Sequence, residues 1–175
     1  MKSTGVIRRI DDLGRIVIPK EIRKNLRIKE GDNLEIYISS EDLVLKKYSY
    51  LKRITDLAQE LADTLSNYLN KDVLITDTDS IIAASGKSRK EYLNKNISNY
   101  IIECIQRRQK FIETNKKEIE LIQKHKINCN YLISTIISNS EAVGAIIVFS
   151  EEEKLVPEEF KIANIAASFV AKYLE

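Results

Sequence analysis

The sequence predicts two modules: an all-β module over residues 1–50 and an α+β domain over residues 71–175, joined by a helix over residues 51–70. Two observations predict this division. Apolar and polar residues alternate in short runs up to residue 47, as they do in half-buried strands. From residue 51 to 69 apolar residues instead recur every three or four positions, as they do along one face of a helix.

The N-terminal module is expected to contain short β segments and one short helix. Val6–Ile10 and Arg15–Ile18 are β-branched runs on either side of a turn at Leu13–Arg15. Pro19 cannot continue a strand ladder but suits the start of a helix, which we predict over Lys20–Leu26. The remaining strands of the module are Leu34–Ile38 and Leu43–Leu45.

The small size of this module predicts that it does not fold alone. A module of fewer than about 50 residues buries too little apolar surface for confident independent stability. Residues 1–50 contain no cysteine and no histidine, so neither a disulfide nor a zinc ion is expected to reinforce them. We therefore expect a two-fold symmetric dimer that covers the apolar strand faces.

Spacings of three and four residues over 51–69 match the seam of a coiled coil. The apolar positions with this spacing are Leu51, Ile54, Ala58, Leu61, Leu65 and Tyr68. Such a helix can pack on its own domain, or it can pair with the same helix of another subunit. Both arrangements remain open at this point, and different parts of the helix can satisfy each.

The second domain is expected to begin at Lys71 with a hairpin formed by Val73–Ile75 and Ile81–Ala84. A helix marked by Ile97–Ile105 follows. A second hairpin and a final helix after Pro157 complete the domain, over Tyr131–Ser138, Ala142–Phe149 and Glu158–Tyr173. The order β-β-α-β-β-α predicts an antiparallel sheet with helices on one face or at its ends.

Composition is that of a soluble globular protein, with 43% hydrophobic and 31% charged residues. The first residues, Met1–Gly5, carry no apolar signal region, and no run approaches the roughly 18 apolar residues of a membrane span. We therefore expect a cytoplasmic protein with no membrane partner.

The charges are distributed unevenly along the chain. Residues 1–29 hold nine basic and three acidic side chains, a net charge of +6, so the other 146 residues sum to −4. A short basic module on a mildly acidic body is typical of proteins in which one module binds the phosphates of a nucleic acid.

The run from Met1 to Arg23 resembles the swapped-hairpin DNA-binding domain of AbrB-family transition-state regulators. Its most specific part is Leu13-Gly14-Arg15, followed by three β-branched residues and Pro19-Lys20. Within that family the resemblance is greatest to members in which a linker helix and a GAF-like domain follow the AbrB-type domain. The resemblance implies a dimer that binds double-stranded DNA, and a role in sporulation as both activator and repressor.

The resemblance also implies which residues contact DNA. The positions that match the family's contacts are Arg8, Arg15, Arg23 and Lys24, and Lys2 and Arg9 flank the same surface. Relatives commonly carry arginine at the position of Lys24, and lysine keeps the charge but not the planar fork. No helix-turn-helix is present, so strands and loops must present the arginines, which favours recognition of DNA shape.

In the second domain, three features were weighed as chemical sites. Asp77 and Asp79 can hold a cation or simply accept local backbone hydrogen bonds, and the second interpretation is favoured. Cys104 and Cys129 are expected to be free buried thiols, and His125 is expected to face solvent. No catalytic set can be assembled, so we expect no enzyme activity, no metal and no cofactor, and either an unidentified small effector or a purely structural role for the GAF-like domain.

Two other classes of protein compete with the transcription regulator. AbrB-type domains also occur in antitoxins, whose tails are short and disordered when free, whereas this tail carries periodic apolar segments through residue 174. A GAF-type enzyme tethered to DNA is disfavoured by the lack of catalytic residues. Since each module offers a dimer surface, we expect a homotetramer.

Overall fold

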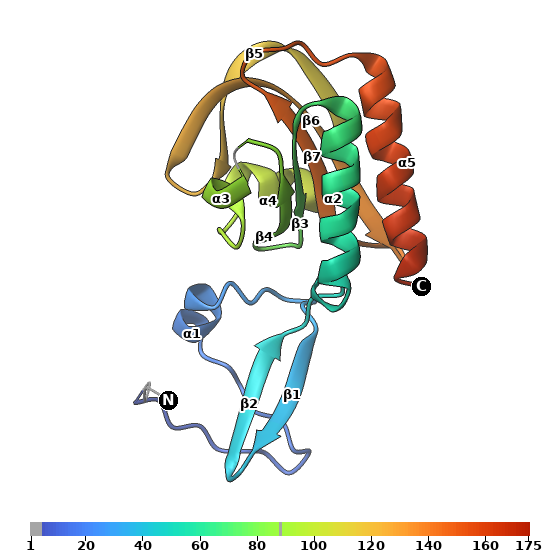
Figure 1. Ribbon diagram of the computed structural model, residues 1–175. Coiled ribbons are helices and arrows are strands. Elements are labelled where there is room, and N and C mark those ends of the chain that lie inside the picture. Colours follow the sequence, from blue (N-terminus) through green and yellow to red (C-terminus); the bar gives the residue numbers. More distant parts are fainter. Residues whose placement is uncertain (1–4, 88) are drawn as a thin grey trace. The chain divides into compact units, whose positions relative to one another are not determined.

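The computed structural model describes residues 5–87 and 89–175 and divides into two compact units. The division falls between Tyr48 and Ser49, and we call residues 1–48 the head and residues 49–175 the tail. In Figure 1 the head is drawn in blue to cyan, and the colours of the tail continue to red at the C-terminus. Helix 55–69, which lies in the predicted linker, belongs to the tail.

Within residues 5–48 the head contains one short helix and one hairpin. Helix α1 spans Lys20–Asn25, and strands β1 (Leu34–Ser39) and β2 (Asp42–Lys47) pair antiparallel from Leu34 opposite Lys47 to Ser39 opposite Asp42. The predictions of this helix and this hairpin are confirmed. Residues 5–19 run as an irregular ribbon without a strand (Figure 1), although β-branched runs predicted two strands there. A strand forms only where a neighbouring strand can share its backbone hydrogen bonds. Within the described residues of one chain, β1 and β2 pair only with each other, so residues 5–19 have no strand beside them.

Helix α1 ends in a motif that fixes the chain direction. Arg27 adopts a left-handed backbone with φ of 55°. The amide of Ile28 donates to the carbonyl of Arg23 at 2.8 Å, and the amide of Arg27 donates to that of Lys24 at 3.2 Å. These two hydrogen bonds form a Schellman motif, which satisfies the last carbonyls of the helix.

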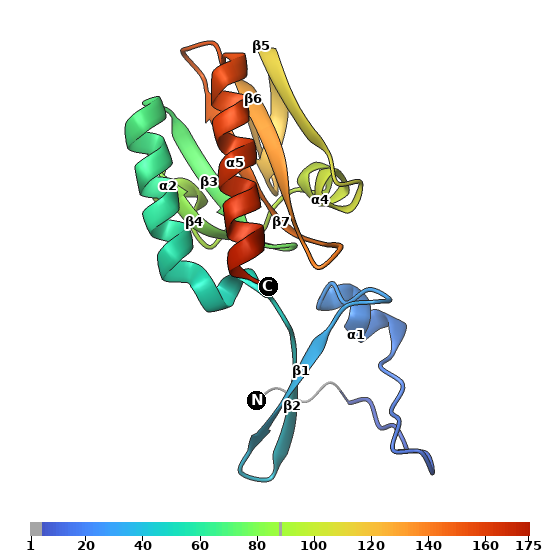
Figure 2. The same ribbon diagram turned by 90° about the vertical axis from the view of Figure 1, so that its right-hand side faces the viewer.

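The tail is a five-stranded antiparallel sheet with helices on both faces. The strands are β3 (Asp72–Thr76), β4 (Ile81–Ser85), β5 (Lys110–Ile122), β6 (His125–Ser138) and β7 (Glu141–Ser150), in the order β4-β3-β7-β6-β5. The helices are η1 (Leu51–Ile54), α2 (Thr55–Leu69), α3 (Arg89–Tyr92), α4 (Asn99–Gln106) and α5 (Pro157–Tyr173). Helices α2 and α5 lie side by side on one face, as Figures 1 and 2 show from two directions.

Each face of the sheet has its own hydrophobic core. Val73 and Ile75 pack with α2 and α5, whereas Leu74 between them packs with α4 on the opposite face. The prediction that helices lie on one face or at the ends is therefore wrong. Strands β3 and β7 are buried at nearly every position, and β6 is buried almost without a break from Cys129 onward, as expected for strands covered on both faces.

Local signals in the sequence position several elements of the tail. Ser98 caps α4 by accepting a hydrogen bond from the amide of Ile101 at 3.2 Å, and Pro157 begins α5. Asn70 ends α2 in a left-handed conformation with φ of 53°. The predicted hairpins and final helix are confirmed, whereas the long strand β5 was missed by the sequence interpretation. Among the described residues, no helix combines the length and apolar character needed to cross a membrane.

We predict that Gly144→Ala destabilises the tail. A Cβ at this position would overlap the carbonyl oxygen of Thr76 and the Cδ1 atom of Leu51, both in the packed interior. Overpacking of this kind costs about 1–3 kcal/mol, so the urea midpoint followed by circular dichroism should fall. Glu141→Ala at an exposed position of the same strand is the control and should change stability by less than about 0.5 kcal/mol. Equal midpoints for the two variants would contradict this packing.

Candidate nucleic-acid interface

The turn over residues 11–15 presents Arg15 to solvent. The amide of Asp11 donates to the carbonyl of Arg15 at 3.1 Å, and the amide of Gly14 donates to the carbonyl of Asp11 at 3.0 Å. Gly14 has φ of +76°, a backbone conformation that residues with a Cβ rarely adopt. The turn therefore follows directly from the Asp-Asp-Leu-Gly-Arg sequence.

Asp11 holds the backbone amide and the Nε atom of Arg15, whereas the side chain as a whole remains largely exposed. Its Nε atom donates to Asp11 Oδ2 at 2.7 Å, and its backbone amide donates to Asp11 Oδ1, also at 2.7 Å. The side chain of Arg15 is nevertheless 71% exposed. The hydrogen bonds from the backbone and then from the side chain of Arg15 lower the pKa of Asp11, so the carboxylate is ionised at neutral pH.

The other predicted contact residues lie on the extended segment and on α1. Arg8 and Arg9 are exposed before the turn, and Arg8 bends back so that one terminal nitrogen donates to the carbonyl of Ile7 at 3.2 Å. Arg23 and Lys24 are exposed in the last turn of α1. Lys2 lies outside the described residues. Sequence reasoning missed Asp11, although an aspartate four residues before an arginine, with glycine between them, is a recognisable turn signal.

This set of side chains has the chemistry for binding a polyanion. An arginine offers five donors in a planar fork, which can bridge phosphate oxygens or donate to O6 and N7 of guanine. A short basic module is also expected to attract nucleic acid from a distance, and this attraction weakens with salt.

In the tail, the Asp77-x-Asp79 pair serves local structure. Asp77 is 2% exposed and accepts hydrogen bonds from the amides of Asp79 at 2.8 Å and Ser80 at 2.6 Å. Its other oxygen accepts from the hydroxyl of Ser49 at 3.0 Å and lies 3.5 Å from the ammonium of Lys52. No cluster of three metal-binding side chains occurs within residues 5–87 and 89–175. The carboxylate thus fastens the start of the tail to the β3–β4 turn.

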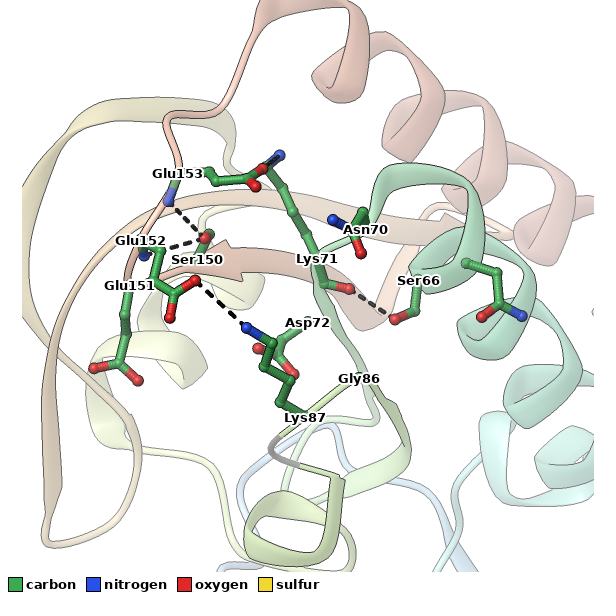
Figure 3. A pocket seen from close by; sticks show the side chains of 11 residues that line it. Ser66, Asn70, Lys71, Asp72, Gly86, Lys87, Ser150, Glu151, Glu152 and Glu153 are labelled. Carbon is green, nitrogen blue, oxygen red and sulfur yellow. Dashed lines mark hydrogen bonds and ion pairs between the residues drawn. The ribbon is translucent and has the colours of Figure 1, made fainter.

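A polar groove of about 600 Å³ lies where α2 ends, β3 begins and β7 ends (Figure 3). Lys71, on its rim, contacts Glu153 and Glu159, each at 3.0 Å. Lys87 across the groove lies 3.4 Å from Glu152. Since both cations of the groove already have carboxylate partners, the groove offers little that would attract an anionic ligand.

The single histidine pairs with a carboxylate instead of simply facing solvent. His125 Nε2 lies 3.0 Å from Glu91 Oε1, and the imidazole meets the ring of Tyr92 edge-on at 6.0 Å between centroids. This contact joins the β5–β6 turn to α3. The environment is that of a structural contact between a turn and a helix.

The two cysteines are confirmed as free and buried. Burial raises the pKa of Cys129 to about 12, with a smaller contribution from the charge of Glu151. Burial likewise raises the pKa of Cys104. Because the thiolate is the nucleophilic form, neither environment favours thiol chemistry.

Comparison with known proteins identifies relatives of both units. Residues 53–175 match the family described as stage V sporulation protein T C-terminal, transcription factor. Residues 7–53 match the family described as antidote-toxin recognition MazE, bacterial antitoxin. The whole chain is 43% identical to stage V sporulation protein T of Bacillus subtilis (strain 168) and covers 99% of that protein.

Further similarities concern one unit each. A segment of 48 residues, 27% of this chain, is 58% identical to the transition state regulatory protein AbrB of Bacillus subtilis (strain 168), half of whose length it covers. The cofactor-binding GAF domain of the nutrient sensor CodY from Clostridium difficile aligns with 67% of this chain and 83% of its own, with a TM-score of 0.52. At 11% identity this likeness shows the fold alone. The predicted combination of an AbrB-type head and a GAF-like tail is confirmed.

We predict that neither thiol reacts with Ellman's reagent in the native protein at about pH 8, near the ordinary pKa of a free thiol. Burial both blocks access and suppresses the thiolate, so colour should develop only after unfolding. Denaturation in guanidinium chloride is the control and should release both thiols of each chain. Rapid native-state reaction of either cysteine would instead reveal an accessible thiolate.

Proposed function

Because the chain belongs to the stage V sporulation protein T family, we propose that it is a DNA-binding transcription regulator that activates and represses sporulation genes. The observation that carries the proposal is the match to stage V sporulation protein T, which extends over the full chain and joins an AbrB-type head to a GAF-like tail. We assign it no catalytic activity, and its place of action is the DNA of the nucleoid.

The contact surface consists of basic residues of the head, of which those within the described residues are exposed. The contacts to double-stranded DNA come from Lys2, Arg8, Arg9, Arg15, Arg23 and Lys24. If four of these in each of two subunits touch phosphates, about eight counterions are released, and affinity falls steeply with salt. Between residues 5 and 48 the head has no recognition helix to insert in the major groove, since α1 has only six residues. Sequence preference therefore depends strongly on the shape and deformability of the duplex.

Two heads form the binding unit. Ile7 is 90% exposed and Ile38 is 83% exposed in the single chain, and Val17 and Leu13 are 74% and 70% exposed. The extended segments on either side of the Asp11–Arg15 turn carry β-branched residues without a strand to pair with. Interleaving with a second head supplies the missing ladder and doubles the number of arginines facing the duplex.

The tail offers a second self-association surface on its helical face. Along α5, Ile165, Phe169 and Tyr173 recur at helical spacing and are 52–70% exposed. Tyr68 on the neighbouring α2 is 77% exposed. The inner side of α2 is occupied by its own domain, through Ala58, Ala62, Leu65 and Leu69. The outer stripe remains for another subunit, and head and tail contacts together make a homotetramer.

The tail serves assembly more readily than sensing. Tyr92, Phe149 and Ile101 fill the core between the sheet and α4, and each is at most 1% exposed. An effector that enters this core must displace well-packed side chains. The same folded tail argues against the antitoxin alternative, whose tails fold only on binding a toxin. For the domain limits we propose the head at 1–50, a connecting helix at 51–70 and the GAF-like domain at 71–175.

We predict that Arg15→Ala removes specific DNA binding and leaves the head dimer intact. Removing a fork contact of about 1–3 kcal/mol from each of two subunits weakens binding by roughly 30-fold or more. An exposed side chain contributes little to stability, so size-exclusion elution should not change. Lys116→Ala, which removes the same charge from an exposed position of the tail, is the control for a gel-shift titration. Undiminished affinity of the Arg15 variant would count against the assigned surface.

We also predict that Phe169→Glu converts the tetramer to a dimer. A carboxylate at the centre of a helix-to-helix contact would be buried without a partner, which disfavours association. Light scattering should report half the mass of the unaltered protein. Ser168→Glu, at an exposed position of α5 beside the apolar stripe, should keep the tetramer. A dimeric mass for the unaltered protein would refute the tail contact.

A further inference from the structure

We propose that Asp11 is a positioning residue of the DNA-binding surface, which orders the guanidinium of Arg15 so that its terminal nitrogens face the duplex. The inference rests on the proposed function, because it assigns Asp11 a role at the same surface. It concerns an acidic residue in a segment, residues 1–29, that holds nine basic and three acidic side chains.

The geometry assigns two tasks to one carboxylate. Asp11 Oδ1 accepts from the amides of Arg15 at 2.7 Å and Leu13 at 3.1 Å, which closes the turn. Asp11 Oδ2 accepts from Arg15 Nε at 2.7 Å. The turn and the direction of the arginine side chain are thus fixed by the two oxygens of a single group.

Because Asp11 binds Nε of Arg15, the two terminal nitrogens of the guanidinium remain available for other contacts. A guanidinium has five N–H donors, of which Nε carries one and the two terminal nitrogens carry four. Fork contacts to a phosphate or to guanine can use the terminal nitrogens. Holding Nε therefore leaves this fork intact and removes rotational freedom that binding would otherwise have to remove.

The Asp11–Arg15 ion pair is expected to contribute little to the free energy of unfolding. The side chains of Asp11 and Arg15 are 36% and 71% exposed, and exposed ion pairs contribute little to folding. Near a duplex, moreover, a carboxylate repels phosphates. The neighbouring Asp12 is also exposed, and its side chain makes no hydrogen bond or ion pair with any other described residue. Substitution of Asp12 therefore measures how removal of one negative charge changes DNA affinity when no side-chain contact is lost.

The two substitutions Asp11→Asn and Asp12→Asn remove the same charge from adjacent positions. The asparagine at position 11 keeps one oxygen for the backbone amides of the turn, but it places an amide NH₂ where Arg15 Nε needs an acceptor. If charge alone mattered, both variants would bind DNA more tightly. Our inference predicts that the DNA affinities of the two variants differ. Asp12→Asn should bind DNA as tightly as the unaltered protein or more tightly. Asp11→Asn should bind roughly ten-fold more weakly, because the Arg15 side chain in each of two subunits is no longer held in one orientation.

The experiment is a double-mutant cycle in the full-length protein. The probe is a duplex that the unaltered protein selects from random-sequence DNA, and a shuffled duplex of equal length measures non-specific binding. Affinities are measured for Asp11→Asn, Asp12→Asn, Arg15→Ala and the Asp11→Asn, Arg15→Ala double variant. Thermal melting and elution volume show that each variant is folded and associated.

The expected result is that Asp11→Asn weakens binding to the selected duplex only when Arg15 is present, so that the double variant binds no more weakly than Arg15→Ala. The inference is overturned if Asp11→Asn matches Asp12→Asn. It is also overturned if Asp11→Asn weakens the Arg15→Ala protein as much as the unaltered one, because Asp11 would then act only through the turn. In both cases Arg15→Ala still loses binding, and the proposed function stands. If the unaltered protein binds no DNA, or if Arg15→Ala binds normally, the proposed function fails and the inference with it.

Discussion

The head exposes more apolar strand surface than a chain of its length is able to cover. Its hairpin and its extended N-terminal segment present isoleucine, leucine and valine side chains to water, and one six-residue helix cannot shield them. A second copy would bury these side chains, and the proposed dimer is argued from that gain. The basic residues of the described head lie on this N-terminal segment and on α1, so the proposed dimer would bring two sets of them together.

How much of the fold the sequence predicts depends on how local each signal is. The hairpins of β3–β4 and β6–β7 and the helix after Pro157 were predicted because turn residues and periodicity lie within a few positions. Strand β5 was missed because it is an edge strand with charged side chains, such as Lys116 and Lys117, that read as a loop. The two-sided covering of the sheet was missed for another reason. It depends on which strands lie at the centre, and this information comes from pairing between distant segments.

At the candidate site, too, local features could be predicted from the sequence and contacts that depend on the folded structure could not. The basic positions of the head could be predicted, because a fingerprint of residue types identifies them. The partnership of Asp11 with Arg15 could not, because it requires the three-dimensional turn that brings Nε to the carboxylate. In the tail, the local interpretation of Asp77 and the burial of the thiols were predicted correctly from residue type alone. The side chain of His125 is 38% exposed, and its contact with Glu91 could not be predicted, since Glu91 is distant in sequence.

Fastening Ser49 to the buried Asp77 has a mechanical consequence for the tail. The hydroxyl of Ser49 donates to Asp77 Oδ2, and the ammonium of Lys52 lies 3.5 Å from the same oxygen, so the residues that precede α2 are tied to the β3–β4 turn. A force applied to the chain at residue 49 would therefore act on the sheet before it acts on α2. Unwinding of the helix from this end requires that the contacts of Asp77 break first.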